Sequence, residues 1–245
     1  MIDVHAHIHG PDFEADLEQV LRRASRAGVK AVISASVDVS DSLRCLKVAG
    51  GHSMVYPEIG LAPYSDLGQL EDMLRLIQER RSEIVGIGEI GLDYPWEKHP
   101  EQVEPFRRQV RLAKKLGLPV TVHSRSAGKY VLDILEEEGA ERVHLHSFGG
   151  SKKDVRRAVS LGYYFSINCR VAVSRKIQDM VLMLPEDLIL LETDSPVLGL
   201  APGRNEPANL AKNAEAVSKL LKVKPEEFEK IAEENSKRIF SRIDL

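Results

Sequence analysis

The stretch Ile2-Asp3-Val4-His5-Ala6-His7-Ile8 opens the alternation of strands and helices that decides the fold. Side chains alternate between the two faces of an extended strand, so we expect Asp3, His5 and His7 to share one face and the apolar residues to share the other. Neutral imidazole is a common ligand of zinc and similar ions. Such pairs also occur in strands without metal, so the stretch raises the question of whether the chain supplies further ligands.

The rest of the chain repeats this strand-helix unit. Further buried strands are expected at 30–35, 54–60, 84–90, 119–123, 142–146, 163–168 and 188–192. Helices are expected at 11–27, 40–49, 67–81, 102–116, 129–138, 152–160 and 174–184, followed by two helices within 205–245 that are separated near Pro225. Eight units predict an α/β fold, a TIM (β/α)8 barrel, and no glycine fingerprint follows the first strand to favour a doubly wound sheet. We expect a single domain over 1–245, with the C-terminal helices completing the outer ring and closing one end of the barrel.

Composition narrows the classes of function. The net charge is -3, so phosphate recognition must come from local charge or bound metal ions rather than from attraction by the whole protein. Cys45 and Cys169 lie far apart and form no CxxC motif, which indicates neither a disulfide framework nor a thiolate zinc site. No signal-peptide pattern and no apolar run of membrane-spanning length are found. We expect a cytoplasmic protein without membrane contact.

Polar residues that a strand core disfavours stand at the ends of five expected strands. In a TIM barrel the carboxyl ends of all strands meet at the face where active sites are built. The metal-capable residues at these ends are His5, His7, Glu89, His123, His146 and Asp194. Each alone also fits a structural role, but six in one register predict a metal site. Four imidazoles and two carboxylates exceed one tetrahedral site, so we expect two divalent ions, Mg²⁺, Mn²⁺ or Zn²⁺, bridged by one carboxylate.

Five motifs carry these residues. They are His5-x-His7, Gly88-Glu89-Ile90-Gly91-Leu92-Asp93, His123-Ser124-Arg125, His146-Ser147-Phe148-x-Gly150 and Glu192-Thr193-Asp194-Ser195-Pro196, with Arg204-Asn205-Glu206-Pro207 and Asn235-Ser236-Lys237-Arg238-Ile239-Phe240 further along the chain. In order and spacing the set resembles the TatD-related metal-dependent hydrolases, a branch of the amidohydrolase-type TIM barrels whose best-known activity is deoxyribonuclease.

The resemblance implies that His5, His7 and Asp194 bind one ion. It implies that His123 and His146 bind the other, with Glu89 bridging. A metal lowers the pKa of bound water, and we expect Glu89 and Asp194 as the catalytic residues, with Asp194 as the general base.

The expected function is hydrolysis of phosphodiester bonds in DNA ends or single strands, with nucleic acid as partner and no obligate protein partner. Two alternatives stay open. One is a metal-dependent ester or amide hydrolase such as a D-aminoacyl-tRNA deacylase, and the other is a metal-binding barrel without catalysis.

Four residues are candidates for substrate binding. Arg125 has a guanidinium suited to a forked contact with phosphate, or it is an exposed loop residue. Glu192 shares a strand face with Asp194 and orients either a ligand or a substrate group. Arg204 and Asn205 bind substrate or brace the last helix.

The remaining polar residues are expected outside the ligand set. Asp3 is expected to support the histidines, Asp93 to stabilise its loop and His144 to lie a layer deeper than His146. His9, His52 and His99 are outside the pattern, and Trp96 is a weak candidate for base stacking. One departure from the family concerns Gly60-Leu61-Ala62-Pro63-Tyr64, since the family commonly has Gly-x-His-Pro there. The missing histidine at Ala62 leaves the substrate preference open.

Overall fold

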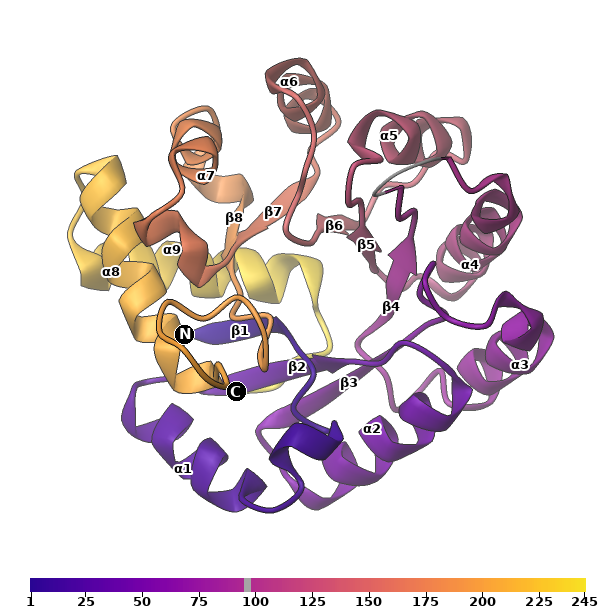
Figure 1. Ribbon diagram of the computed structural model, residues 1–245, viewed down its shortest axis with the longest axis horizontal. Coiled ribbons are helices and arrows are strands. Elements are labelled where there is room, and N and C mark those ends of the chain that lie inside the picture. The colour runs from indigo at the N-terminus through magenta and orange to yellow at the C-terminus, as the bar shows by residue number, and fades with distance from the viewer. Residues whose placement is uncertain (95–97) are drawn as a thin grey trace.

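The computed structural model describes residues 1–94 and 98–245, and eight parallel strands in sequence order form its centre, with helices around them (Figure 1). The strands are β1 (Ile2–Ala6), β2 (Ala31–Ala35), β3 (Val55–Ile59), β4 (Gly86–Gly91), β5 (Val120–His123), β6 (Val143–Leu145), β7 (Tyr164–Ile167) and β8 (Ile189–Leu191). The prediction of a TIM barrel is confirmed.

Helices follow the strands in the expected order. They are α1 (Leu17–Arg26), α2 (Val39–Gly51), α3 (Leu70–Glu79), α4 (Val103–Leu116), α5 (Gly128–Glu137), α6 (Lys152–Ser160), α7 (Arg175–Val181), α8 (Leu210–Leu221) and α9 (Pro225–Ile239), with short 3-10 turns η1 (Pro11–Phe13), η2 (Leu67–Gln69), η3 (Pro100–Gln102), η4 (Cys169–Ala172), η5 (Glu186–Leu188) and η6 (Pro207–Asn209). The expected helix 11–27 begins only at Leu17, because Asp16 has a non-helical φ of -141°. None of these helices has the length and apolarity needed to cross a membrane.

β1 carries a register irregularity at its candidate ligand. The strand advances three residues from Asp3 to Ala6 while β2 advances two, from Val32 to Ser34. Such a bulge inserts one residue and redirects the side chains around it. The strict alternation predicted for this strand is therefore wrong. Its apolar residues divide between two clusters, Ile2 and Val4 in one and Ala6 and Ile8 in the other.

β4 has the same feature at Glu89. It advances three residues from Ile87 to Ile90 while β5 advances two, from Val120 to Val122. Glu89 lies inside this irregular segment and is 2% exposed. Bulges are common beside active sites because they re-aim a side chain without ending the strand. A register irregularity therefore lies at both His5 and Glu89, the two buried candidate ligands within strands.

The barrel closes between β8 and β1 just beyond the end of β8. The Asp194 N–H donates to the His5 carbonyl at 2.9 Å, and the His7 N–H donates to the Ser195 carbonyl at 2.7 Å. These bonds join the segments that carry three of the candidate ligands. The same hydrogen bonds therefore close the barrel and hold these candidate ligands side by side.

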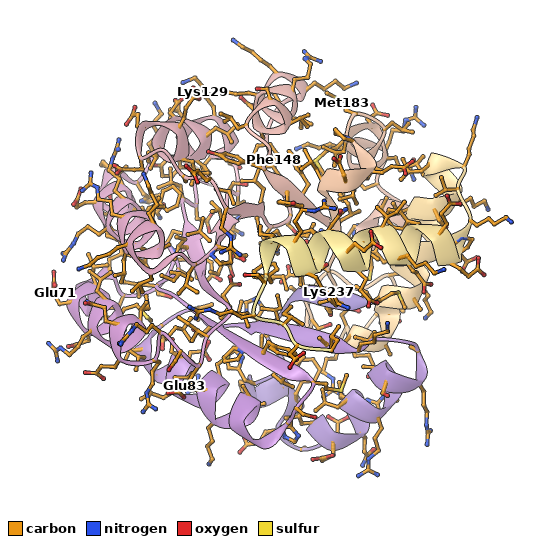
Figure 2. The ribbon with its side chains drawn as sticks, turned by 180° about the vertical axis from the view of Figure 1, so that it is seen from behind. Glu71, Glu83, Lys129, Phe148, Met183 and Lys237 are labelled. Carbon is orange, nitrogen blue, oxygen red and sulfur yellow. The ribbon has the colours of Figure 1, made fainter. Side chains whose placement is uncertain are left out.

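Helix α9 covers the amino-terminal end of the barrel. Figure 2 shows this helix lengthwise across the molecule, with Lys237 labelled on it. The Asn235 side chain donates to the carbonyl of Ile189, at the start of β8, at 2.9 Å. Beneath the helix lies a separate apolar cluster of Ile2, Val4, Ala31, Ile33, Val85, Leu190, Ile239, Phe240 and Ile243. Phe240 is fully buried, and its ring packs edge-on against His144 with ring centroids 5.8 Å apart. Phe240 therefore fills the interior at this end of the barrel.

Candidate metal centre

The six candidate ligands lie together at the carboxyl end of the barrel. A cavity of about 370 Å³ opens there, and five of them line it: His7, Glu89, His123, His146 and Asp194. His5 lies beneath the cavity and is fully buried. The structure thus brings together residues from five strands, as the strand-end pattern predicted.

His5, like His123, is an unsatisfied polar group at this end of the described chain. Neither of its ring nitrogens has a hydrogen-bond partner among the described residues. Its Nε2 lies 3.7 Å from a carboxylate oxygen of Glu89 and 3.7 Å from one of Asp194. Burial is the main cause that holds the pKa of His5 well below its usual value, and the neighbouring His146 lowers it further. A buried neutral imidazole without a partner, facing two carboxylates, fits a metal ligand.

Among residues 1–94 and 98–245, two sets of three residues offer ligand atoms within 4.8 Å of one another, and both contain His5. They are His5, His7 and Asp194, and His5, Glu89 and His146. The first set is the one that the resemblance implied. His7 fits it because its Nδ1 bonds the Ala35 carbonyl at 2.7 Å, which leaves Nε2 to face Asp194 at 3.4 Å.

The second set contains His5 where the resemblance implied His123. The ring of His123 lies between two carboxylates instead, with Nδ1 2.5 Å from Oε1 of Glu89 and Nε2 3.6 Å from Oδ2 of Asp93. His123 therefore contacts the other candidate ligands by way of Glu89. Its place as a ligand stays a prediction.

Glu89 is placed to join the two sets. Its Oε2 lies 3.7 Å from His5 and 3.8 Å from His7, while its Oε1 faces His123. Burial opposes ionisation of this carboxyl, but the surrounding histidines, His123 above all, hold its pKa well below the usual value. An ionised carboxylate whose two oxygens face different sides fits a bridging ligand.

Asp194 is held in a backbone conformation that few residues adopt. Its φ is 54°, in the left-handed region that aspartate tolerates better than most residues. Asp3 anchors the residue before it, accepting from the Thr193 N–H at 2.9 Å and from the Thr193 hydroxyl at 2.6 Å. Asp3 thus acts on the backbone that carries Asp194, in addition to the His5 N–H at 3.4 Å.

Glu192 lies under His146 and has no exposed surface. Its Oε2 bonds Nδ1 of His146 at 2.7 Å, and its Oε1 accepts from the Ser147 hydroxyl at 2.7 Å. The bond at Nδ1 directs the other nitrogen of His146 toward the centre. Of the two roles expected for Glu192, orienting a ligand fits this position; contact with substrate does not, because the side chain is enclosed.

The hydrogen bonds continue from Glu192 across the barrel interior. The Ser166 hydroxyl donates to Glu192 at 2.5 Å and lies 2.6 Å from Nε2 of His144. Nδ1 of His144 lies 2.9 Å from the Thr121 hydroxyl, which donates to Glu58 at 2.8 Å. His144 is therefore part of a layer below the ligands, as expected.

Glu58 is a buried carboxyl that the sequence reasoning missed. Its Oε2 has no hydrogen-bond partner within the described residues, and burial raises its pKa to about 8. A Cβ atom at Gly88 would lie 2.9 Å from Cδ of Glu58 and 2.7 Å from Cβ of Thr121. Glycine at this position therefore provides the space in which the Glu58 side chain lies. The signal was present in the sequence as a glutamate inside the apolar strand Val55–Ile59 and a Gly-x-Gly in the next strand.

The other candidate substrate residues are engaged with the protein. Arg125 forms a forked contact with Asp93, at 2.7 and 2.6 Å, although its side chain is 61% exposed. Arg204 pairs with Asp16 at 2.7 Å and lies over the ring of Phe13. In the structure, these two arginines brace loops.

Asn205 also has a bracing position. It is buried, and its side-chain amide donates to the carbonyls of Thr193 and Val197 at 2.8 Å each. It therefore holds the loop after β8, within which Asp194 lies. Trp96 falls outside the described residues.

Tyr64 and His9 are among the residues that line the cavity without having been assigned to it from the sequence. Tyr64 donates its hydroxyl to Oε2 of Glu89 at 3.0 Å, and burial together with the Glu89 charge raises the pKa of this phenol. His9 also lines the cavity, with Nδ1 2.7 Å from the Ser34 hydroxyl and Nε2 2.9 Å from Asp41. No spacing in the sequence indicated either contact, since each depends on how the loops fold back.

Comparison with known proteins finds relatives over nearly the whole chain. A model of the family described as TatD related DNase matches residues 2–241, a span that includes all six candidate ligands. The chain is 35% identical to the uncharacterized metal-dependent hydrolase YabD of Bacillus subtilis (strain 168), with 98% of each protein covered. It is 34% identical to deoxyribonuclease TATDN3 of Homo sapiens, covering 99% of this chain and 95% of that protein. The solved structure of YJJV, a TatD homolog from Escherichia coli K12, superposes with a TM-score of 0.91 at 28% identity, with 98% of each chain covered.

Proposed function

This chain belongs to the TatD related DNase family of metal-dependent hydrolases, and we propose that it hydrolyses phosphodiester bonds of DNA ends or single strands with two divalent ions. The observation that carries the proposal is the buried, unpartnered imidazole of His5 between two carboxylates. A relative named a deoxyribonuclease supports DNA as the substrate.

The ligand sets support two adjacent sites. His5, His7 and Asp194 would hold one ion. The other ion would be held by His146, which groups with Glu89 and His5, and by His123, which faces Glu89 and is included because of the family resemblance. The four imidazoles favour Zn²⁺ over Mg²⁺ by ligand chemistry, and Mn²⁺ remains a candidate. Bound divalent ions would acidify a water molecule and offset the negative charge of a phosphate.

Asp194 is the side chain that we propose takes the proton from the attacking water. Asp194 borders the cavity at 8% exposure, so its carboxylate is available to accept a proton from water as the general base. The oxygen of water bonds to phosphorus, one phosphorus–oxygen ester bond breaks, and the proton taken from water is passed to the leaving alkoxide, which departs as an alcohol. Within residues 1–94 and 98–245 no lysine or arginine lines this cavity, so phosphate binding depends on the ions.

The location that we propose is the cytoplasm. Cys45 and Cys169 are buried free thiols, which fits a reducing compartment.

The test is a metal reconstitution assay. Purified protein is freed of metal with a chelator, supplied with Mg²⁺, Mn²⁺ or Zn²⁺, and tested against single-stranded DNA, a model phosphodiester and a D-aminoacyl-tRNA. We expect metal-dependent cleavage of DNA and of the diester. Activity that resists the chelator would refute the metal mechanism, and cleavage of the aminoacyl ester alone would refute the nuclease assignment.

A paired substitution tests the ligand set. His5→Ala is expected to lower the bound metal per molecule, whereas His52→Ala, at the C-terminal end of α2 and outside this cavity, is expected to leave it unchanged. Equal metal content in both variants would remove His5 from the site.

A further inference from the structure

Tyr64 is a large aromatic residue that is half exposed at the rim of the catalytic cavity. We propose that its ring is the stacking surface for the nucleobase next to the scissile phosphodiester. This rests on the proposed function and adds the part of the substrate that the protein, rather than the ions, recognises.

The two ends of the Tyr64 side chain face different surroundings. Its hydroxyl is bonded to Oε2 of Glu89 at 3.0 Å, and its ring meets the ring of His123 edge-on with centroids 5.5 Å apart. The residue is nevertheless 50% exposed. A tyrosine anchored at its polar tip with open ring surface beside a reaction centre is suited to stacking on a planar group.

The loop that carries Tyr64 is fixed before any substrate arrives. Gln109, fully buried in α4, accepts from the Leu61 N–H at 2.8 Å and donates to the Leu61 carbonyl at 3.1 Å. The Val37 carbonyl accepts from the Ala62 N–H at 2.9 Å and from the Ser65 hydroxyl at 2.8 Å. Because the loop is already ordered, stacking on Tyr64 incurs little further loss of entropy.

The rim around Tyr64 is matched to an uncharged planar group. Pro11 and Val197 also line the cavity, and Val197 is 53% exposed. Of the acidic residues that line the cavity outside the ligand set, Asp12 is exposed and would repel a second phosphate, whereas Asp41 is buried and paired with Arg44 at 2.7 Å. Ala62 has no polar side-chain atom and is fully buried, so Tyr64 supplies the polar contact from this loop to Glu89.

The test compares probes with and without a base. The diesters are thymidine 5′-(p-nitrophenyl phosphate) and methyl p-nitrophenyl phosphate, and the binding probes are thymidine 5′-phosphate and methyl phosphate, measured by calorimetry without turnover. Tyr64→Ala is expected to weaken thymidine 5′-phosphate binding and raise KM for the thymidine ester roughly five- to hundredfold. Both methyl probes should lose less than the thymidine probes, and their smaller loss, which reports the hydroxyl contact with Glu89, should be the same in Tyr64→Phe.

Two further variants distinguish the contribution of the Tyr64 ring from that of its hydroxyl and from the loss of any exposed side chain. Tyr64→Phe keeps the ring and is expected to retain the preference for the thymidine probes. Leu43→Ala is the matched control, because Leu43 is also 50% exposed but lies in α2 outside the cavity; it should change nothing.

The outcomes distinguish this proposal from the proposed function. Equal losses on thymidine and methyl probes, or no loss on either, would overturn the stacking role of Tyr64. If the wild-type protein hydrolyses neither diester, the phosphodiesterase assignment fails, and binding of thymidine 5′-phosphate still decides whether Tyr64 contacts a base.

Discussion

The two ends of the barrel are built from the same eight strands but from opposite kinds of side chain. At the carboxyl end, buried imidazoles and carboxylates crowd around His5, whose ring nitrogens have no partner among the described residues. At the amino-terminal end, Phe240 and the apolar cluster beneath α9 fill the interior. Buried unpaired polar groups cost stability, whereas buried apolar groups supply it. The candidate catalytic residues and the apolar cluster that stabilises the fold therefore lie at opposite ends of the barrel. Substitutions at each end test whether activity and stability depend on different residues.

The largest effect is expected at the apolar end. Phe240→Ala removes a fully buried ring and leaves a cavity, which we expect to lower the free energy of unfolding by about 3–5 kcal/mol in urea titrations. The turnover of the molecules that remain folded should stay near the wild-type value. A large fall in kcat at a temperature where the variant is fully folded would contradict the separation of the two ends.

At the polar end, Glu89→Ala is expected to lower the turnover of molecules that are fully folded, which Phe240→Ala should not do. Removal of the carboxylate between the two ligand sets should lower kcat about a hundred- to thousandfold and reduce the bound metal. Unfolding of the metal-free variant should occur at a lower urea concentration, because the histidines lose the carboxylate that they hold in its ionised form. Glu83→Ala, at a half-exposed position far from the centre, serves as control. Full activity of the Glu89 variant would refute its bridging role.

A smaller effect is expected one layer below. Glu192→Gln keeps an acceptor for Nδ1 of His146 but removes its negative charge. We expect metal affinity to fall about ten- to hundredfold, because partners of ligating histidines tune their basicity. The KM measured at saturating metal should not change, since Glu192 is enclosed. A raised KM under those conditions would instead place Glu192 in contact with substrate.

The smallest effect concerns Glu58, midway between the two ends. Burial raises its pKa to about 8 from 4.5, so the folded state favours the protonated form. Its contribution to stability is full below pH 4.5 and is lost as the pH rises through 8. Glu58→Gln cannot ionise, so its unfolding free energy should vary less across this window and exceed the wild-type value by about 1–2 kcal/mol near pH 8. Parallel pH profiles for the two proteins would show that Glu58 is ionised in the fold.

Local patterns predicted the strand order and most element positions. The helix after β1 was the clearest exception, because burial of Phe13 in a 3-10 turn and the non-helical Asp16 delay its start to Leu17. The strict alternation predicted for β1 also failed, since the bulge between Asp3 and Ala6 depends on pairing with β2. Periodicity records the average geometry of a strand and carries no information about an inserted residue.

The sequence by itself determined the barrel and the six candidate ligands, because apolar periodicity marks each strand and a polar residue at a strand end is placed by topology at one face. Only the tertiary structure decided which of them meet. It placed His5 in both ligand sets, enclosed Glu192 beneath His146, and turned Tyr64 onto Glu89. Each of these contacts joins residues far apart in the chain, and contacts of that kind follow from strand register and loop packing rather than from any local pattern.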